Sequence, residues 1–485
     1  MGALAASAIL FLAGCTTGPA YHRPAVQAPT HWQAQGPWRA AQPAASLPKG
    51  DWWTIFKDAE LNRYEARAVA GSPTLAASAS RLQQARDVVR ITQSGLFPQL
   101  SAGLTAQRDR VSANRPSTGA VPPSTAVTQS AYAIPFTLSW EADLFGGLRR
   151  GVEAANAQLQ GSTAANANLR LILTAELAAD YFSLRETDAE IAAVQANIAL
   201  QQKALDYVKA RHAGGVASGL DVAQQQTLLD STRTQISLLQ RQRAQFEHAI
   251  AALIGVPAPE FTLPVRALAA TPPAIPVGVP SGLLQRRPDI AAAERQMAAA
   301  NAEIGVARSA FFPDVVLAAG AGLQSRGLSG LFNASSTFWS LGVGAAEDIF
   351  SGGRKHAQLD FARAGYQATV SDYRQTVLNA FQEVEDGLSG LGTLADAAAS
   401  QQRAVTDARN ALQLARNRYD GGLDPYINVI TEQENLVNAQ RLADQIRGQQ
   451  MVTSVTLIKA LGGGWDASAL AAVPLKTDSH QAWRQ

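Results

Sequence analysis

The sequence contains two copies of one pattern, and this repetition limits the possible folds more than any other feature. Three short motifs recur in the same order: Ser94–Pro98 as Ser309–Pro313, Asp143–Gly147 as Asp348–Gly353, and Arg211–Val216 as Arg418–Leu423. The second copy follows the first by about 205 to 215 residues each time. So regular an offset predicts two similar units in one chain, a first repeat over residues 51–265 and a second over 266–464, followed by a tail at 465–485.

Each repeat has two stretches in which apolar residues alternate with small or polar ones, the pattern of a β-strand. The predicted strands are about 99–110, 131–143, 314–325 and 337–349. Each has roughly 12 residues, enough to cross an outer membrane when tilted. Four strands cannot close a membrane barrel, and open sheet edges are not tolerated in lipid. Membrane-spanning strands would therefore need several chains in one barrel; the alternative is two ordinary hairpins packed on helices.

Most of the remaining sequence predicts long helices. Apolar residues fall at every seventh position, for example Leu177, Leu184, Ile191, Ile198 and Leu205 in the first repeat, and Val377, Val384, Leu391, Ala398, Val405, Leu412 and Tyr419 in the second. Sustained heptads are typical of coiled-coil packing. A helix opens each repeat, and long helices are expected at about 153–213, 221–254, 354–420 and 425–461. Gly214-Gly215 and Gly421-Gly422 interrupt these runs, so each repeat should end in a helical hairpin.

The N-terminus resembles a bacterial lipoprotein signal. Residues 1–14 form an apolar segment of signal-peptide length, although no Lys or Arg precedes it. Leu12-Ala13-Gly14-Cys15 is similar to a lipobox, and Cys15 is the single cysteine of the chain. If Cys15 is lipidated, its acyl chains would anchor the protein to a membrane. Residues 15–50 are rich in Pro, Gly and Ala and predict an extended tether rather than a domain.

The composition argues against an enzyme or a nucleic-acid-binding protein. The formal net charge is only +2, and charged residues make up 16 %, below the ~25 % of ordinary soluble domains. The six histidines show no metal-ligand spacing, and no phosphate-binding loop or nucleophile elbow is present. We therefore expect no catalytic residues, no metal and no cofactor. No stretch of 18 apolar residues occurs, so no transmembrane helix is expected beyond the short N-terminus.

Four strings strengthen these expectations and suggest a family. They are Leu284-Gln285-Arg286-Arg287-Pro288-Asp289-Ile290, Ala310-Phe311-Phe312-Pro313, Ala380-Phe381-Gln382-Glu383-Val384, and Lys459-Ala460-Leu461-Gly462-Gly463-Gly464-Trp465. With the lipobox and the duplicated strand–helix units, they resemble the outer-membrane factor family of TolC-like and OprM-like channels. The likeness extends over nearly all of the chain after Cys15 and is nearest to the lipoprotein branch that serves resistance-nodulation-division (RND) pumps.

The resemblance implies a mainly α-helical fold with a membrane β part. Three chains would share one twelve-stranded barrel in the outer membrane of a Gram-negative bacterium, and their helices would form a hollow periplasmic tunnel. Partners would be a periplasmic adaptor and, through it, an inner-membrane RND pump. The implied function is a passive exit duct for drugs and other small molecules.

The resemblance also implies a gate at the hairpin turns. Tyr419 matches the gate tyrosine, and Asp221 matches an acidic gate position. Asn428 and Thr431 match positions where relatives carry carboxylates, and Asp424 stands where some relatives have arginine. For Asp221 and for Asp424, a helix cap is as good an interpretation as a gate residue, and one residue can fill both roles. The tip glycines Gly214, Gly215, Gly421 and Gly422 would contact the adaptor.

Two other functions remain open at this stage. A channel for type I protein secretion would have the same fold but other partners, and its gene neighbourhood would reveal it. A lipid-anchored coiled-coil scaffold would have no pore and would give no conductance in a lipid bilayer.

Overall fold

The computed structural model describes residues 16–25, 27–33, 39–40, 50–114, 126–268, 270–278 and 280–471. Cys15, the signal-like segment and the end of the tail lie outside these residues. The chain forms two compact units, one of residues 1–24, 83–161 and 294–372 and the other of 25–82, 162–293 and 373–485. Each unit therefore takes residues from both expected repeats.

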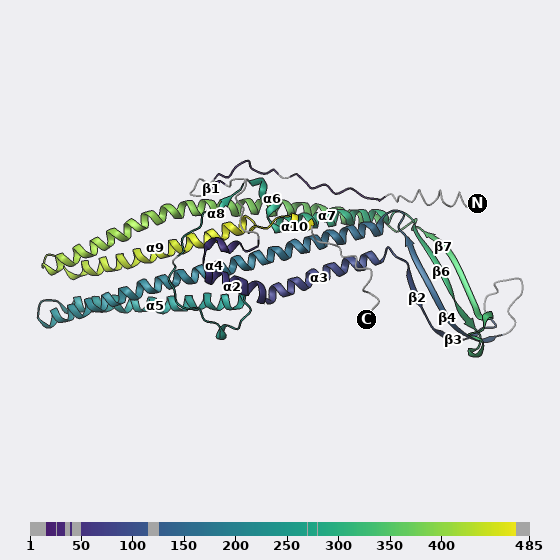
Figure 1. Cartoon of the computed structure of the whole chain (residues 1–485), viewed down its shortest axis with the longest axis horizontal. Helices are drawn as coiled ribbons and strands as arrows, with labels where there is room; N and C mark the ends of the chain where they lie inside the picture. Colours follow the sequence, from purple (N-terminus) through teal and green to yellow (C-terminus); the bar gives the residue numbers. More distant parts are fainter. Residues whose placement is uncertain are drawn as a thin grey trace. The chain divides into compact units, whose positions relative to one another are not determined.

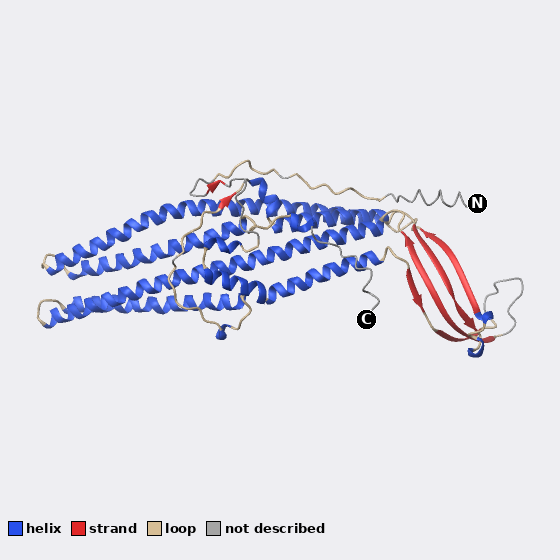
Figure 2. Ribbon diagram, viewed as in Figure 1, coloured by secondary structure: helices blue, strands red, loops and turns tan. Residues whose placement is uncertain are grey.

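The first unit contains an antiparallel sheet with strands from both repeats (Figures 1 and 2). Its strands are β2 (Gln99–Ala102), β3 (Thr105–Val111), β4 (Val127–Ala142), β6 (Asp314–Ser325) and β7 (Thr337–Ala346). β4 pairs with β2 and β3 on one side and with β6 on the other, and β6 pairs with β7. Within the chain, β2 and β3 form one free edge of the sheet and β7 forms the other.

The first strand differs from the prediction because it is broken in two. We expected one strand over about 99–110, whereas β2 and β3 are separated at Gly103-Leu104. Gly103 donates its N–H to the Pro135 carbonyl at 2.9 Å. Pro135 of β4 has no N–H to return, so the ladder is interrupted at this pair. β4 in turn begins earlier than the predicted residue 131, because Val127 pairs with Val111 at the end of β3.

The two faces of the sheet differ in chemistry. Cross-strand partners lie on the same face, and one such row joins Leu100, Leu138, Ala319 and Leu341. The neighbouring row joins Ala102, Phe136, Ala321 and Trp339. The other face carries a row of Ser101, Thr137, Gly320 and Ser340, in which the Ser101 and Thr137 hydroxyls hydrogen-bond at 2.6 Å. Trp339 and Leu341 are 81 % and 76 % exposed, so none of the described residues covers these two side chains of the apolar face.

The helices occur in pairs of equal length. α3 (Pro73–Ser94) and α7 (Pro288–Ser309) have 22 residues each, α4 (Gly147–Ala213) and α8 (Arg354–Asp420) have 67, and α5 (Gly219–Leu253) and α9 (Tyr426–Ala460) have 35. α4 begins several residues before the predicted 153 because Asp143 accepts hydrogen bonds from the N–H groups of Leu148 and Arg149. No helix among the described residues is both long and apolar enough to cross a membrane.

The second unit contains two helical hairpins, α4–α5 (the first hairpin) and α8–α9 (the second hairpin) (Figure 1). The heptad residues lie on their packed faces: Leu177, Leu184 and Leu205 are almost completely buried in α4, as are Val377 and Val384 in α8. Shorter elements in this unit include the 3-10 helix η1 (Trp52–Phe56), α2 (Ala59–Gly71), α6 (Leu283–Arg286) and α10 (Ser468–Ala471). Two-residue strands β1 (Arg39–Ala40) and β5 (Pro276–Val277) pair in parallel.

A buried ionic network joins the first hairpin to α2. Arg185 of α4 is 1 % exposed and pairs with Glu60 at 2.9 Å and with Asp188 at 2.8 Å. Arg243 of α5 reaches Asp188 at 2.7 Å and donates to the Leu263 carbonyl at 2.7 Å. Buried charges are tolerated only when they are paired in this way, so the network specifies how these three helices pack.

The described part of the N-terminal segment is fastened to the helices by hydrogen bonds. In the first unit, Thr17 donates to the Phe145 carbonyl through both its N–H and its hydroxyl, at 3.1 and 3.0 Å. The Tyr21 hydroxyl donates to Glu294 at 2.6 Å. In the second unit, Trp32 is buried and donates its indole N–H to the Gly278 carbonyl at 2.7 Å.

Candidate functional site

The tips of the two hairpins have the same backbone turn. The Val216 N–H donates to the Arg211 carbonyl at 2.9 Å, and the equivalent Leu423 N–H donates to the Arg418 carbonyl at the same distance. These are the carbonyl-capping bonds of a helix end with a left-handed residue. Gly215 and Gly422 take that conformation, with φ of +75° and +68°. The expected tip glycines therefore form the turns.

The tips differ in how the following helix begins. At the first tip, Ser218 and Asp221 form a capping box: the Ser218 hydroxyl accepts the Asp221 N–H at 3.1 Å, and the Asp221 carboxylate accepts the Ser218 N–H at 3.0 Å. At the second tip the N-cap residue is Pro425, which has no side-chain cap. The expectation that Asp424 caps α9 is therefore wrong. Its carboxylate instead receives two hydrogen bonds from the Arg418 guanidinium, at 2.6 and 3.0 Å.

Side chains near the tips connect the two hairpins. The Tyr207 hydroxyl of α4 donates to the Asp420 carboxylate of α8 at 3.0 Å. The Arg211 guanidinium lies over the Tyr419 ring, 4.9 Å from its centroid, and donates to the Tyr207 hydroxyl at 3.1 Å. The Tyr426 hydroxyl donates to Gln225 of α5 at 2.7 Å and is buried. A cation over an aromatic face is attractive, so these contacts hold the hairpins together at their ends.

Arg211 was not predicted as a connecting residue, although a comparison of the two repeats contains the signal. Arg211 and Arg418 occupy equivalent positions, but Ala217 stands where the second repeat has Asp424. Arg418 therefore pairs within its own tip. Arg211 has no acid in the equivalent place and reaches the second hairpin instead.

The predicted gate residues are partly brought together. Tyr419 is buried, and its ring lies 4.8 Å from that of Tyr426. Asn428 lies close enough to Asp424 to help lower the pKa of that carboxyl, after the larger effect of Arg418. Thr431 is exposed, and its hydroxyl donates to the Ile427 carbonyl of its own helix at 3.0 Å.

The electrostatics keep the tyrosines neutral and Asp424 ionised. Burial raises the pKa of Tyr419, and burial also raises the pKa of Tyr426 well above its usual range. The hydrogen bond from Arg418 lowers the pKa of Asp424. The site therefore offers ion pairs and aromatic packing. Among the described residues no cluster of three or more His, Cys, Asp or Glu side chains is arranged to hold a metal.

A sheet with one uncovered apolar face, combined with paired helical hairpins, defines a class of outer-membrane channels. The chain is similar to the solved structure of the outer-membrane channel OprN, with a TM-score of 0.86 and 28 % sequence identity. The match covers 93 % of this chain and 100 % of the OprN chain. A family model described as outer membrane efflux protein matches residues 66–256 and 279–463, one segment in each repeat. The chain belongs to this family of outer membrane efflux proteins.

Named relatives agree with this assignment. The chain is 34 % identical over 462 residues to the probable efflux pump outer membrane protein SepC of Pseudomonas putida, covering 94 % of this chain and 95 % of that protein. It is 33 % identical over 474 residues to the solvent efflux pump outer membrane protein SrpC of Pseudomonas putida, covering 95 % and 98 %. The chain is thus an efflux channel protein of the outer membrane of Gram-negative bacteria.

Proposed function

We propose that three copies of this chain form one passive exit duct, with their sheets closed into a twelve-stranded barrel. The observation that carries the proposal is the sheet, which has an uncovered apolar face and two free edges. An open edge leaves backbone N–H and C=O groups unpaired, which lipid does not tolerate. Joining the β7 edge of one copy to the β2 and β3 edge of the next would satisfy both edges at once.

The proposed duct works with two partners and does no chemistry of its own. A periplasmic adaptor would bind the tips at Gly214, Gly215, Gly421 and Gly422, and an inner-membrane RND pump would supply the energy through it. Lipidation of Cys15 would add an anchor in the membrane. Because SrpC is named for solvent efflux, we propose small organic molecules as the exported class.

The proposed gate is the set of contacts at the hairpin ends. Tyr207, Arg211, Tyr419 and Asp420 link the hairpins of one chain, and opening would require these contacts to loosen. Asp221, Asp424, Asn428 and Thr431 stand beside them as candidate gate residues. Packed helices can shift between two discrete arrangements. The proposed gate would open by such a shift of the hairpins.

Conductance of the purified protein in planar lipid bilayers tests this function. We expect a small resting conductance that rises in Arg211→Gln, because that change removes the cation from Tyr419 and the donor from Tyr207. Lys209→Gln is the matched control, since Lys209 is exposed on the same helix. A protein that never conducts would contradict the duct. An unchanged resting conductance in Arg211→Gln would remove only the gate assignment.

A further inference from the structure

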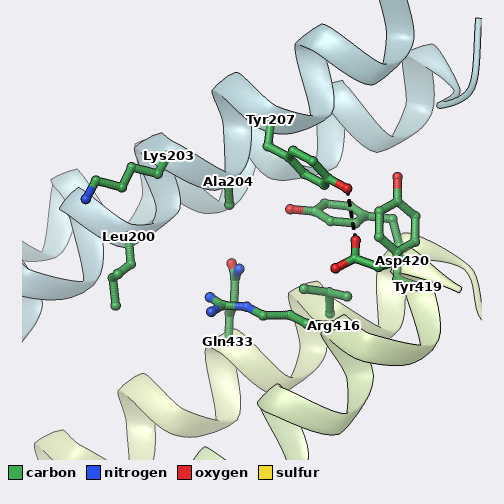
Figure 3. A pocket seen from close by; sticks show the side chains of 10 residues that line it. Leu200, Lys203, Ala204, Tyr207, Arg416, Tyr419, Asp420 and Gln433 are labelled. Atoms are coloured by element: carbon green, nitrogen blue, oxygen red, sulfur yellow. Dashed lines mark hydrogen bonds between the residues drawn. The ribbon is translucent and has the colours of Figure 1, made fainter. Parts of the chain in front are cut away.

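A cavity of about 350 Å³ lies between α4 of the first hairpin and α8 and α9 of the second (Figure 3). Its apolar walls include Leu200, Tyr207, Tyr426 and Val429. Ligand pockets in proteins occupy about 300–1,000 Å³ and combine aromatic walls with a few polar groups. The cavity therefore has room for one small molecule.

Two buried polar groups at this cavity lack partners. Gln433 is 5 % exposed, and neither atom of its amide has a hydrogen-bond partner in the described part of the chain. The Tyr419 hydroxyl is likewise unpartnered there, in a residue that is 8 % exposed. Figure 3 shows the Gln433 side chain extending from α9 toward Ala204 of α4. An unsatisfied buried polar group is costly, so its presence in a native structure needs an explanation.

The charge at the cavity favours an anion. Lys203 and Arg416 both line it, and no ion pair joins either of them to a described residue. Asp420 is the one acid among the lining residues, and its carboxylate accepts the Tyr207 hydroxyl at 3.0 Å. The lining therefore holds two cations and a single acid, and that acid is already hydrogen-bonded.

We propose that this cavity binds a small amphiphilic organic anion, consisting of an aromatic body and one carboxylate. The carboxylate would pair with Lys203 and Arg416, and the Gln433 amide would hydrogen-bond to it. The aromatic body would lie against Tyr207, Tyr419 and Tyr426. Such a ligand contacts both hairpins of one chain, and its binding does not depend on whether the assembly conducts.

Binding of 2-naphthoate to the full-length protein in lipid nanodiscs tests the proposal, with empty nanodiscs as the background. We expect saturable binding at pH 7. Neutral 2-naphthylmethanol should bind about tenfold more weakly, because a hydrogen bond to a charged group contributes at least that factor. The cation 2-naphthylmethylammonium should bind more weakly still. Absence of saturable binding, or equal binding of the cation, would overturn the proposal.

Variants locate the binding within the protein. Lys203→Gln and Arg416→Gln should each weaken 2-naphthoate about tenfold. Gln433→Leu, which keeps the bulk but removes the amide, should also weaken it. Lys209→Gln is exposed on α4 outside the cavity and should bind as the parent does. Since Lys203 is exposed, its variant is expected to fold. Parent-like affinity in both Lys203→Gln and Arg416→Gln would rule out this cavity.

Discussion

Single residues set the difference between the two hairpin tips. The backbone turns match, but an acid at position 424 holds Arg418, whereas Ala217 leaves Arg211 available to reach Tyr419. At this position an acid accompanies a contact within one tip, and alanine accompanies a contact between the hairpins. The two tips therefore differ in their contacts. Arg418 binds within the second tip, whereas Arg211 of the first tip links the two hairpins.

A buried acid on α4 gives the fold a pH dependence. Burial, reinforced by a hydrogen bond to Glu190, raises the pKa of Glu186 to about 9. Gly448 makes room for this side chain, since a Cβ there would lie 2.4 Å from the Glu186 Cγ. Glu190 itself is held by Arg441 and Gln445, at 2.9 and 3.0 Å. Glu186 is therefore the member of the cluster that keeps its proton.

We predict that this proton makes stability fall as pH rises. The folded state retains the proton up to about pH 9, whereas an unfolded chain releases it near the ordinary glutamate value of 4.5. The stabilisation that this protonated group contributes is fully present below pH 4.5. Between pH 4.5 and pH 9 it declines, lowering the free energy of unfolding by at most about 1.4 kcal/mol per pH unit. Glu186→Gln mimics the protonated acid at every pH. Its melting temperature should therefore exceed that of the parent by a margin that grows from pH 5 to pH 9.

Glu434→Gln, a change at an exposed acid on α9, is the control and should follow the parent. A margin for Glu186→Gln that stays constant across this range would contradict the assignment of the proton.

At the scale of secondary-structure elements, the sequence pattern predicts whether a segment is a helix or a strand better than it predicts interruptions and contacts. Heptads on α4 and α8 predict both long helices because the pattern repeats over many turns. The division between β2 and β3 could not be read from their own residues, since it arises from Pro135 on the partner strand. The Glu186 cluster was equally hidden, because it forms only when α9 packs against α4. The link from Arg211 to Tyr419 joins residues that are distant in the chain, so local patterns do not show it.

The tip turns depend on one glycine each. Gly422 has a φ of +68°, and no atom lies near the place where a Cβ would stand. A side chain at this position would therefore cause backbone strain but no steric clash. We predict that Gly422→Ala destabilises the second tip by about 1–2 kcal/mol, the cost of a left-handed non-glycine residue. Gly421 lacks a positive φ, which makes Gly421→Ala the matched control with little effect. Hydrogen exchange at the Leu423 N–H should accelerate in the first variant alone; equal protection in both would contradict this account of the turn.

An added charge should impair membrane insertion on one face of the sheet only. Leu341 belongs to the apolar row, while its neighbour Ser340 lies on the small and polar face. We predict that Leu341→Arg costs about 2–4 kcal/mol in the membrane and reduces the amount of inserted protein. Ser340→Arg, which adds the same charge to the other face, should insert normally. Similar outer-membrane levels for the two variants would show that the apolar face does not contact lipid.

At the scale of the whole molecule, the duplication explains why one chain supplies two similar hairpins and four barrel strands to an assembly, with β2 and β3 counted as one interrupted strand. Equal helix lengths in the two repeats, 67 residues for α4 and α8 and 35 for α5 and α9, allow their units to alternate around one axis. We propose that three chains place six such units in a near-sixfold tube. The two repeats of a single chain cannot close a barrel by themselves, because both edges of their sheet remain unpaired.

The stoichiometry of the intact assembly tests this claim most directly. Native mass spectrometry of the protein released from lipid nanodiscs would measure how many chains remain together. We expect three mature chains in each complex, because twelve strands then close the barrel without a free edge. A complex of one or two chains, still folded and inserted in the membrane, would contradict it.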